Sequence, residues 1–366
     1  MTLAPTPPAE RDAAIDVLRG AALFGVLLEN LQHFTHPTYV ELIASGAATS
    51  LDRLGLGAIR MFCDNKVYLL FAFLFGYGIA LQMLRDSRNG ASFVALQLWR
   101  MACLLLIGLA NVLMWTGDIL TTYAVLGCLL LPLRHRSDAA LVRIAGCLLV
   151  APGLAVAGVA AGSQALAWSR PDVEAVVAGL IYPVRQSCFA FAAFALGLAA
   201  GRRRLLSSEA CCERAARALP LALGVGLAGN LAFAVIEAHA PPPLSWEAVA
   251  REATLAVAAP ALAFATALAV LRWAQARAGA GLRGPLAAVG RTTLSNYLLQ
   301  SAIGTGIVAR LGPIHPPSGL LLTLVVFGAQ LAASALWLAR FRFGPVEWLW
   351  RSLAYGRREP LREALR

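Results

Sequence analysis

The chain has 366 residues, of which 59% are hydrophobic and only 14% are charged, and its formal net charge is +11. A soluble globular domain carries about 25% charged residues, and the mean hydropathy of +0.67 excludes that class. Apolar runs long enough to cross a hydrocarbon core of about 30 Å as helices recur along the chain. They are too long and unbroken for the strands of a membrane barrel. The composition predicts an all-α polytopic transmembrane helical bundle.

The polar N-terminal segment 1–14 is predicted to be a disordered cytoplasmic tail, and 15–343 a single transmembrane helical domain. The first apolar run carries Asp16 and Arg19, where a cleaved signal peptide would be purely apolar, so we expect it to stay in the mature protein. About ten spans are expected. In chain order they are 15–34, 66–84, 93–115, 119–133, 139–161, 181–201, 216–237, 252–273, 285–308 and 318–340.

The positive charge is distributed unevenly among the loops. Most of the 31 Lys and Arg residues fall in 84–92, 134–138, 202–217, 272–285 and the tail after Arg340. With ten spans and the N-terminus inside, all of these segments are cytoplasmic, which satisfies the positive-inside rule. We therefore predict a multi-pass protein of the bacterial inner membrane with both termini in the cytoplasm. The basic charge is expected to contact anionic membrane lipids rather than nucleic acid.

The C-terminal segment "RFRFGPVEWLWRSLAYG" differs from the spans in composition. Gly344 and Pro345 are typical of a helix start, and Trp348 and Trp350 suit the headgroup zone. We predict an interfacial helix followed by a basic cytoplasmic tail over 344–366.

The seven cysteines show no disulfide framework, and no metal-ligand spacing is present, so no metal is expected. The vicinal pair Cys211 and Cys212 is a candidate for redox activity.

Polar residues inside a span are costly and usually have a partner or a function. In the first span, Asp16, Arg19 and Asn30 share one helical face. One interpretation is an Asp16–Arg19 ion pair near the headgroups, with Asn30 bonding a neighbouring helix. The other is a polar stripe that binds a donor or lines a substrate path.

Glu29 is followed by His33 one helical turn later and by His36. A carboxylate in this position would orient a histidine as a general base. Alternatively, the three side chains are simply solvated at the outer end of the span. We treat Glu29 and His33 as candidate catalytic residues.

Lys66 is the single lysine of the chain, and it opens the second predicted span. Its ammonium would either snorkel outward or bind a carboxylate or phosphate. Asp118, in "WTGDIL", follows Gly117 in a tight turn. It would either cap the next helix or belong to a catalytic site.

In the ninth predicted span, Thr292, Asn296 and Gln300 recur every four residues and so line one face. Such rows either bind helices to one another or line a substrate path. Arg291, at the cytoplasmic end, is well placed to bind an anionic donor.

Five segments in order resemble the YeiB-like family of bacterial inner-membrane proteins, catalogued as domain of unknown function 418. They are "IDVLRGAALFGVLLENLQHF", "KVYLLFAFLFGYG", "WTGDILTTYAVLG", "VGRTTLSNYLLQSAIGT" and "RFRFGPVEWLWRSLAYG". The resemblance covers nearly the whole chain, and the family domain corresponds to about 200–358.

More remotely, the chain resembles two groups of transmembrane acyltransferases, the heparan-alpha-glucosaminide acetyltransferases and the enzymes that acylate bacterial surface polysaccharides. Both carry an Arg-Gly pair in the first span, matched here by Arg19 and Gly20. The second group has a histidine where this chain has Asn30, whereas the first group has asparagine there. The resemblance implies acyl-CoA as co-substrate, no bound cofactor, and an envelope saccharide or lipid as acceptor.

Two functions follow as hypotheses. The first is an acyltransferase-like enzyme that uses the residues named above. The second is a transporter or permease for a small organic solute, with the same polar faces forming its path. A third, non-catalytic alternative is an anchoring or assembly protein.

Overall fold

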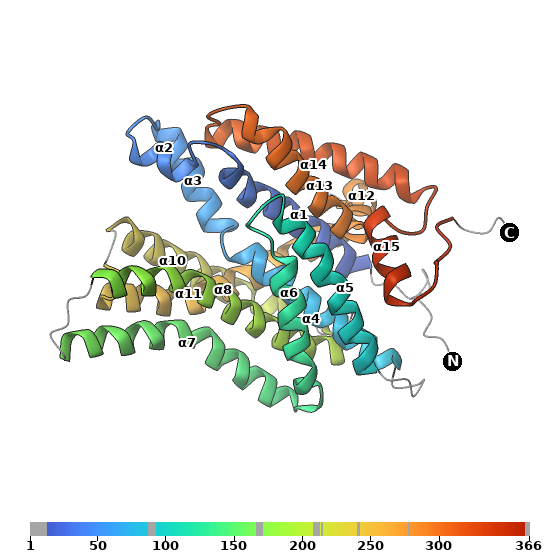
Figure 1. The fold of residues 1–366 in the computed structure, drawn as a ribbon, viewed down its shortest axis with the longest axis horizontal. Helices are drawn as coiled ribbons and strands as arrows, with labels where there is room; N and C mark the ends of the chain where they lie inside the picture. The colour runs from blue at the N-terminus through green and yellow to red at the C-terminus, as the bar shows by residue number, and fades with distance from the viewer. Residues whose placement is uncertain are drawn as a thin grey trace. The chain divides into compact units, whose positions relative to one another are not determined.

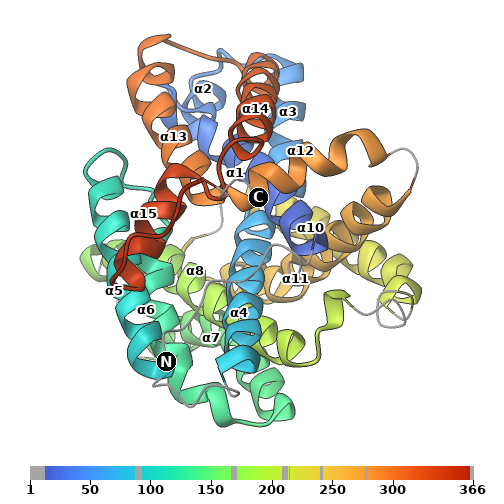
Figure 2. The same ribbon diagram turned by 90° about the vertical axis from the view of Figure 1, so that its right-hand side faces the viewer.

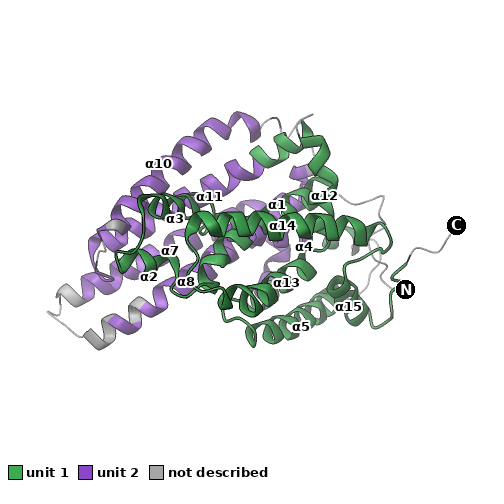
Figure 3. Cartoon of the chain, turned by 90° about the horizontal axis from the view of Figure 1, so that it is seen from above, with its two compact units in different colours: residues 1–67, 82–128, 269–366 green, residues 68–81, 129–268 purple. Residues whose placement is uncertain are grey.

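The computed structural model describes residues 13–86, 93–165, 171–207, 213, 215–239, 242–276 and 279–362. The described part is helical and contains no strand (Figure 1). Most of the predicted tail 1–14, and both Cys211 and Cys212, lie outside the described residues. The chain divides into two compact units, drawn in different colours in Figure 3. Unit 1 comprises 1–67, 82–128 and 269–366, and unit 2 comprises 68–81 and 129–268.

Most helices belong to one unit, and three contribute residues to both. Those of unit 1 are α1 (Ala13–Phe34), α2 (Tyr39–Ala44), α3 (Ser50–Phe62), α5 (Phe93–Val112), α12 (Ala280–Arg291), α13 (Thr293–Gly306), the short η5 (Val308–Arg310), α14 (Pro316–Leu338) and α15 (Pro345–Ala354). Those of unit 2 are η2 (Leu131–His135), α7 (Asp138–Ala165), α8 (Pro171–Arg202), η3 (Leu205–Ser207) and α10 (Leu219–Ala238). The three divided helices are α4 (Lys66–Asp86), α6 (Leu120–Leu130) and α11 (Trp246–Gln275).

Seven helical segments in the described residues are long and apolar enough to cross a membrane. They are Ser50–Arg85, Phe93–Val112, Asp138–Gly162, Gly179–Arg202, Leu219–Glu237, Trp246–Gln275 and Pro316–Leu338. Large apolar side chains such as Leu106, Leu154 and Leu324 are exposed on them, as lipid-facing helices require. The long apolar helices therefore support the prediction of an all-helical membrane protein.

Three predicted spans are helical but are not among these seven. Helix α1 carries several polar side chains in its apolar run. Helix α6 has only 11 residues, and the chain continues beyond it as the short 3₁₀ helix η2. The ninth run is interrupted at Thr292, so that it forms two shorter helices, α12 and α13.

Helices α1 and α12 pack against each other through reciprocal glycines. A Cβ at Gly290 would overlap the carbonyl oxygen of Asp16, and a Cβ at Gly20 would overlap the carbonyl oxygen of Leu286. Small residues allow helix backbones to approach this closely in a membrane protein. Figure 2 shows α12 crossing beside α1 in unit 1. The contact joins the Arg-Gly pair of the first span to the Gly-Arg pair at 290–291.

The segment 35–65, between the first two predicted spans, contains the helices α2 and α3. Each begins with a capping box, Thr38 with Glu41 in α2 and Thr49 with Asp52 in α3. Asp52 also contacts Nδ1 of His315, at the start of α14, at 2.9 Å. Short capped helices of this kind carry little hydropathy signal but satisfy the backbone groups at their own ends.

Within unit 2, α4 and α8 repeat the reciprocal-glycine contact. A Cβ at Gly76 would overlap the carbonyl oxygen of Phe194, and one at Gly197 would overlap that of Phe73. The rings of Phe75 and Phe194 stack with centroids 4.9 Å apart. The "FLFGYG" segment therefore forms a close helix-packing surface, one of the uses of such glycines in membranes.

Candidate functional site

A cluster of charged side chains surrounds Glu29 in unit 1. Asp64 and Lys66 lie close enough to the Glu29 carboxylate to interact with it electrostatically, and the backbone N–H of Asn65 donates a hydrogen bond to it. Asp64 also interacts with the imidazole of His33. We call these five residues the Glu29 cluster. It brings together three residues that the sequence singled out separately, Glu29, His33 and Lys66, and adds Asp64 and Asn65.

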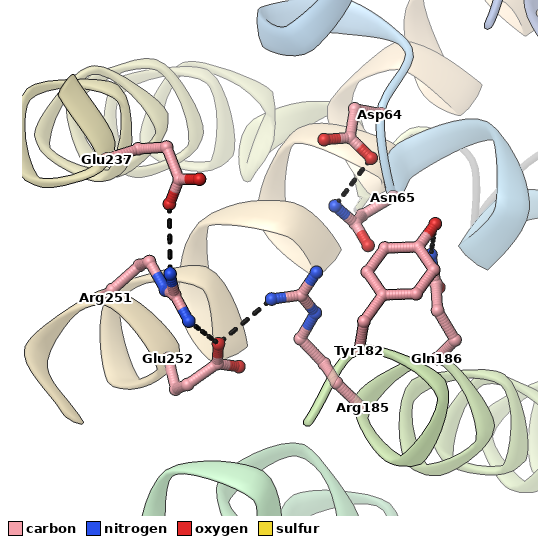
Figure 4. Close-up of polar contacts among 8 residues, drawn as sticks. All are labelled: Asp64, Asn65, Tyr182, Arg185, Gln186, Glu237, Arg251 and Glu252. Carbon is pink, nitrogen blue, oxygen red and sulfur yellow. Dashed lines mark hydrogen bonds and ion pairs between the residues drawn. The ribbon is translucent and has the colours of Figure 1, made fainter. Parts of the chain in front are cut away.

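The turn between α3 and α4 positions the second half of the cluster. Asn65 has a φ of 63°, the left-handed conformation that asparagine tolerates better than most residues. Its Nδ2 donates to Oδ1 of Asp64 at 2.8 Å (Figure 4), while its own Oδ1 is buried without a hydrogen-bond partner. The tight reversal thereby presents Asp64, the Asn65 backbone and Lys66 to the same face of α1.

Lys66 is only 2% exposed, and its Nζ donates to the carbonyl oxygen of Arg60 at 2.7 Å. Its ammonium is therefore held inside the cluster and does not snorkel to the surface. Two carboxylates, Glu29 and Asp64, share this one ammonium. The cluster therefore offers both acidic and basic groups for hydrogen bonds to a substrate.

The α1 side of the cluster is accessible. His33 is exposed, while Glu29 and Asn30 are half-buried; His36, beyond the end of α1, is exposed. The imidazole of His33 is thus the most exposed side chain of the cluster, and it interacts with the half-buried Asp64. That position suits a group that passes protons between the cluster and its surroundings.

The opposite end of α1 carries the other predicted polar residues. Nη1 of Arg19 lies 3.5 Å from Oδ1 of Asp16, which is the local ion pair considered from the sequence. Arg291 ends α12 beside the glycine contact, and its Nη2 donates to the carbonyl oxygen of Arg342 at 3.3 Å. Arg19 and Glu29 are separated by about 15 Å along the helix axis.

Asp118 caps the start of α6. Its Oδ2 accepts hydrogen bonds from the N–H and hydroxyl of Thr121 at 2.8 and 2.7 Å, and its Oδ1 accepts from Nδ2 of Asn111 at 2.8 Å. The Tyr297 hydroxyl accepts from the N–H of Ile119 and also contacts Asp118. The capping alternative therefore has direct geometric support, and the network joins the "WTGD" turn to α13. A catalytic role for Asp118 stays a prediction.

The polar row of the ninth run faces α14. Nδ2 of Asn296 donates to Oγ of Ser334 at 2.9 Å, and Nε2 of Gln300 donates to Oε1 of Gln330 at 2.9 Å. Gln330 in turn donates to the carbonyl oxygen of Asn296. These buried contacts bind α13 to α14. Lining of a substrate path by Asn296 and Gln300 stays a prediction.

Unit 2 contains an ion network that the sequence did not single out. Oε1 of Glu252 lies 2.9 Å from Nη1 of Arg185 and 3.2 Å from Nη2 of Arg251, and Arg251 also reaches Glu237 (Figure 4). Glu252 and Arg185 are 2% and 7% exposed. The sequence signal that could have revealed this network is Arg185, a charged residue inside the predicted span 181–201. Breaking a buried pair of this kind leaves an uncompensated buried charge, so the pair holds its helices in place.

No group of three or more His, Cys, Asp and Glu side chains arranged to hold a metal ion occurs among the residues that the structure describes. Within the same part of the chain, Cys63, Cys103, Cys128, Cys147 and Cys188 are free thiols.

Comparison with known proteins relates the chain to a family of uncharacterized proteins. Residues 200–357 match the family model described as "Protein of unknown function (DUF418)". The chain is 30% identical to the uncharacterized protein YxaH of Bacillus subtilis (strain 168), with 98% of each chain covered. It is 29% identical to the uncharacterized protein YeiB of Escherichia coli (strain K12), over 94% of this chain and 96% of YeiB. An uncharacterized 39.9 kDa protein of Bacillus acidopullulyticus is 26% identical over 96% of both chains. With similarity along its whole length, the chain belongs to the YeiB-like DUF418 family.

Proposed function

We propose that this protein transfers an acyl group from acyl-CoA to a hydroxyl group of an envelope saccharide or lipid. The observation that carries the proposal is the Glu29 cluster, which combines two carboxylates, an ammonium and an accessible imidazole at one end of α1. General acid–base catalysis needs such a group within reach of the acceptor hydroxyl. The remote resemblance to transmembrane acyltransferases supplies the reaction class.

In this reaction His33 is the base that accepts the acceptor hydroxyl's proton, and the carboxylates of Glu29 and Asp64 stabilise the imidazolium that forms. The hydroxyl oxygen forms the new bond to the acyl carbon while the thioester C–S bond breaks. The proton then passes to the departing thiolate. Lys66 holds Glu29 and Asp64 in place by charge attraction.

The donor would bind at the other end of α1. Arg19 and Arg291 offer guanidinium groups to its anionic portion, and its flexible arm would extend along α1 toward Asn30. The α1–α12 glycine contact keeps the backbones of these two arginines close together. The polar row with Asn296 and Gln300 would border the path.

The proposed topology has ten spans in the bacterial inner membrane, with both termini in the cytoplasm. The α15 helix would lie at the cytoplasmic interface, followed by the basic tail, and 15–343 would act as one transmembrane domain. This orientation places the arginines on the side where acyl-CoA is available and the Glu29 cluster on the side of the envelope. A reporter enzyme that is active only in the cytoplasm should be active when it is fused after residue 86, and also when it is fused after residue 362.

The test is turnover of radiolabelled acetyl-CoA by the full-length protein in proteoliposomes, with a total envelope saccharide and lipid extract as acceptor. Acyl transfer should fall at least 100-fold in Glu29→Gln and His33→Ala, since general acid–base catalysis contributes about that much. Glu41→Gln and His36→Ala are the matched controls, because both side chains are exposed outside the cluster. Equal turnover in all four variants, or none in the wild type with any acyl-CoA, refutes the proposal.

Transport is the second candidate, and the burial of Lys66 favours it. Intramembrane acid and base groups that face one another are typical of proton-coupled transporters. Solute flux in proteoliposomes that depends on a proton gradient, and that persists without acyl-CoA, would select this function. The variant Glu29→Gln removes one of these acidic groups, so it should abolish the dependence of solute flux on the proton gradient.

A further inference from the structure

Two guanidinium groups, those of Arg342 and Arg351, lie over the ring of Phe343, and a third, that of Arg291, reaches the backbone of Arg342. The Cζ atoms of Arg342 and Arg351 lie 5.6 and 4.6 Å from the centroid of the Phe343 ring. Nη2 of Arg291 lies 3.3 Å from the carbonyl oxygen of Arg342. Three positively charged side chains are thus held by one short stretch of structure around residues 342 and 343.

Two of these groups have unused donors. Nε of Arg291 and Nε of Arg342 are buried and have no hydrogen-bond partner. Within the described residues, neither arginine forms an ion pair with a carboxylate. A buried polar group left unpaired in this way calls for an explanation, and an absent ligand is one of the recognised ones. The cost is higher for a charged group than for a neutral one.

The carboxylates of the neighbouring segment are engaged elsewhere. Oε1 of Glu347 accepts from the N–H of Ser295 at 3.0 Å, and Oε2 accepts from its hydroxyl at 2.5 Å. Burial raises the pKa of the Glu347 carboxyl above its usual value. Glu359 pairs with Arg357 at 2.8 Å. The charge of Arg291 and Arg342 is therefore left for a ligand.

From this geometry we propose that Arg291, Arg342 and Arg351 bind a phosphate group. The planar guanidinium matches phosphate oxygens with two parallel hydrogen bonds. Phosphate of this kind has two sources at a membrane surface, a soluble phosphorylated compound or the headgroup of an anionic lipid. If the source is soluble, the ligand is the acyl-CoA of the proposed function, and only this identification rests on that proposal.

The experiment uses full-length protein in nanodiscs of pure phosphatidylcholine, with desulfo-coenzyme A as the soluble probe. A parallel set contains phosphatidylglycerol, whose retention on the purified protein is measured by native mass spectrometry. Arg291→Gln and Arg342→Gln should weaken one of the two by about 10- to 100-fold, the loss expected from removing a charged hydrogen-bonding group. Arg340→Gln is the matched control, since Arg340 is exposed in the same segment.

Each outcome decides the matter. Selective loss of desulfo-coenzyme A binding assigns a soluble source, and selective loss of phosphatidylglycerol assigns a lipid source. The proposal is overturned if Arg340→Gln weakens binding as much as Arg291→Gln and Arg342→Gln do. It is also overturned if the wild-type protein binds neither probe, and this second result does not depend on whether any variant folds. Binding without acetyl transfer would leave the phosphate site standing while the acyltransferase proposal fails.

Discussion

Substitution of Gly290 by alanine tests the contact that organises one end of the proposed site. The added Cβ would overlap the carbonyl oxygen and carbonyl carbon of Asp16 and would lie tightly against its Cα. These are backbone atoms of a helix, so no side chain is available to rotate away, and α1 and α12 must separate. Overpacking of this kind costs about 1–3 kcal/mol, and substitution of a helical glycine by alanine returns at most about 1 kcal/mol.

Because the overlap is with backbone atoms, the cost lies in the upper part of that range, at about 2–3 kcal/mol. The net loss is then about 1–2 kcal/mol, or roughly 1–3 °C in melting temperature for a chain of 366 residues at an unfolding entropy of about 2.1 cal/mol/K per residue. The assay is the apparent melting temperature of the purified protein in detergent. Gly281→Ala is the matched control in the same helix, because its Cβ would meet open space. We expect that variant to be neutral or slightly more stable.

The reciprocal variant Gly20→Ala provides a second check. Its Cβ would meet the carbonyl oxygen of Leu286 in the same crossing, so one separation of the helices relieves both overlaps. The double variant Gly20→Ala/Gly290→Ala should therefore lose clearly less than the sum of the two single losses. Additive losses, or a Gly290→Ala melting temperature equal to that of Gly281→Ala, would refute the reasoning.

Three further predictions concern single polar groups. Lys66→Met removes the cation that lies near the carboxylates of Glu29 and Asp64, and it should lower the free energy of unfolding by about 3–5 kcal/mol. An unchanged melting temperature at neutral pH would contradict the role given to Lys66. Gln330→Leu leaves the Gln300 amide without its buried acceptor and should cost about 1–3 kcal/mol, measured in the same way. Hydrogen bonds hold the pKa of the Glu41 carboxyl below its usual value, so its contribution to helix α2 is complete above the usual glutamate pKa and is lost as the pH falls through the lowered one. Amide exchange in α2 should accelerate over that acidic range, and Glu41→Gln should remove this pH dependence.

Much of the fold follows from local sequence. Each of the ten apolar runs is helical, because a run of that length in lipid has to satisfy its backbone hydrogen bonds internally. The Asp16–Arg19 pair and the Asp118 cap were also open to prediction, since partners three residues apart meet through local geometry alone. Helices α2 and α3 were missed because their amphipathic composition gives no long apolar run.

The composition of the candidate site depended on tertiary structure. Glu29, His33 and Lys66 were each notable in the sequence, but an apolar pattern does not say which helix faces which. The left-handed turn at Asn65 decides that Asp64 and Lys66 face Glu29. The buried pair of Arg185 and Glu252 is a comparable case within unit 2.

The sequence by itself determined the class of protein, the helical runs and the residues that are costly to place in a membrane. These depend on transfer from water to lipid, which is nearly additive along the chain. Only the tertiary structure decided which of those residues share a cluster and which hold helices together, because those contacts depend on the close approach of backbones at positions such as Gly20 and Gly290. Opposite ends of α1 thereby acquire different chemistry, with acids and a lysine around Glu29 at one end and arginines near Asp16 at the other.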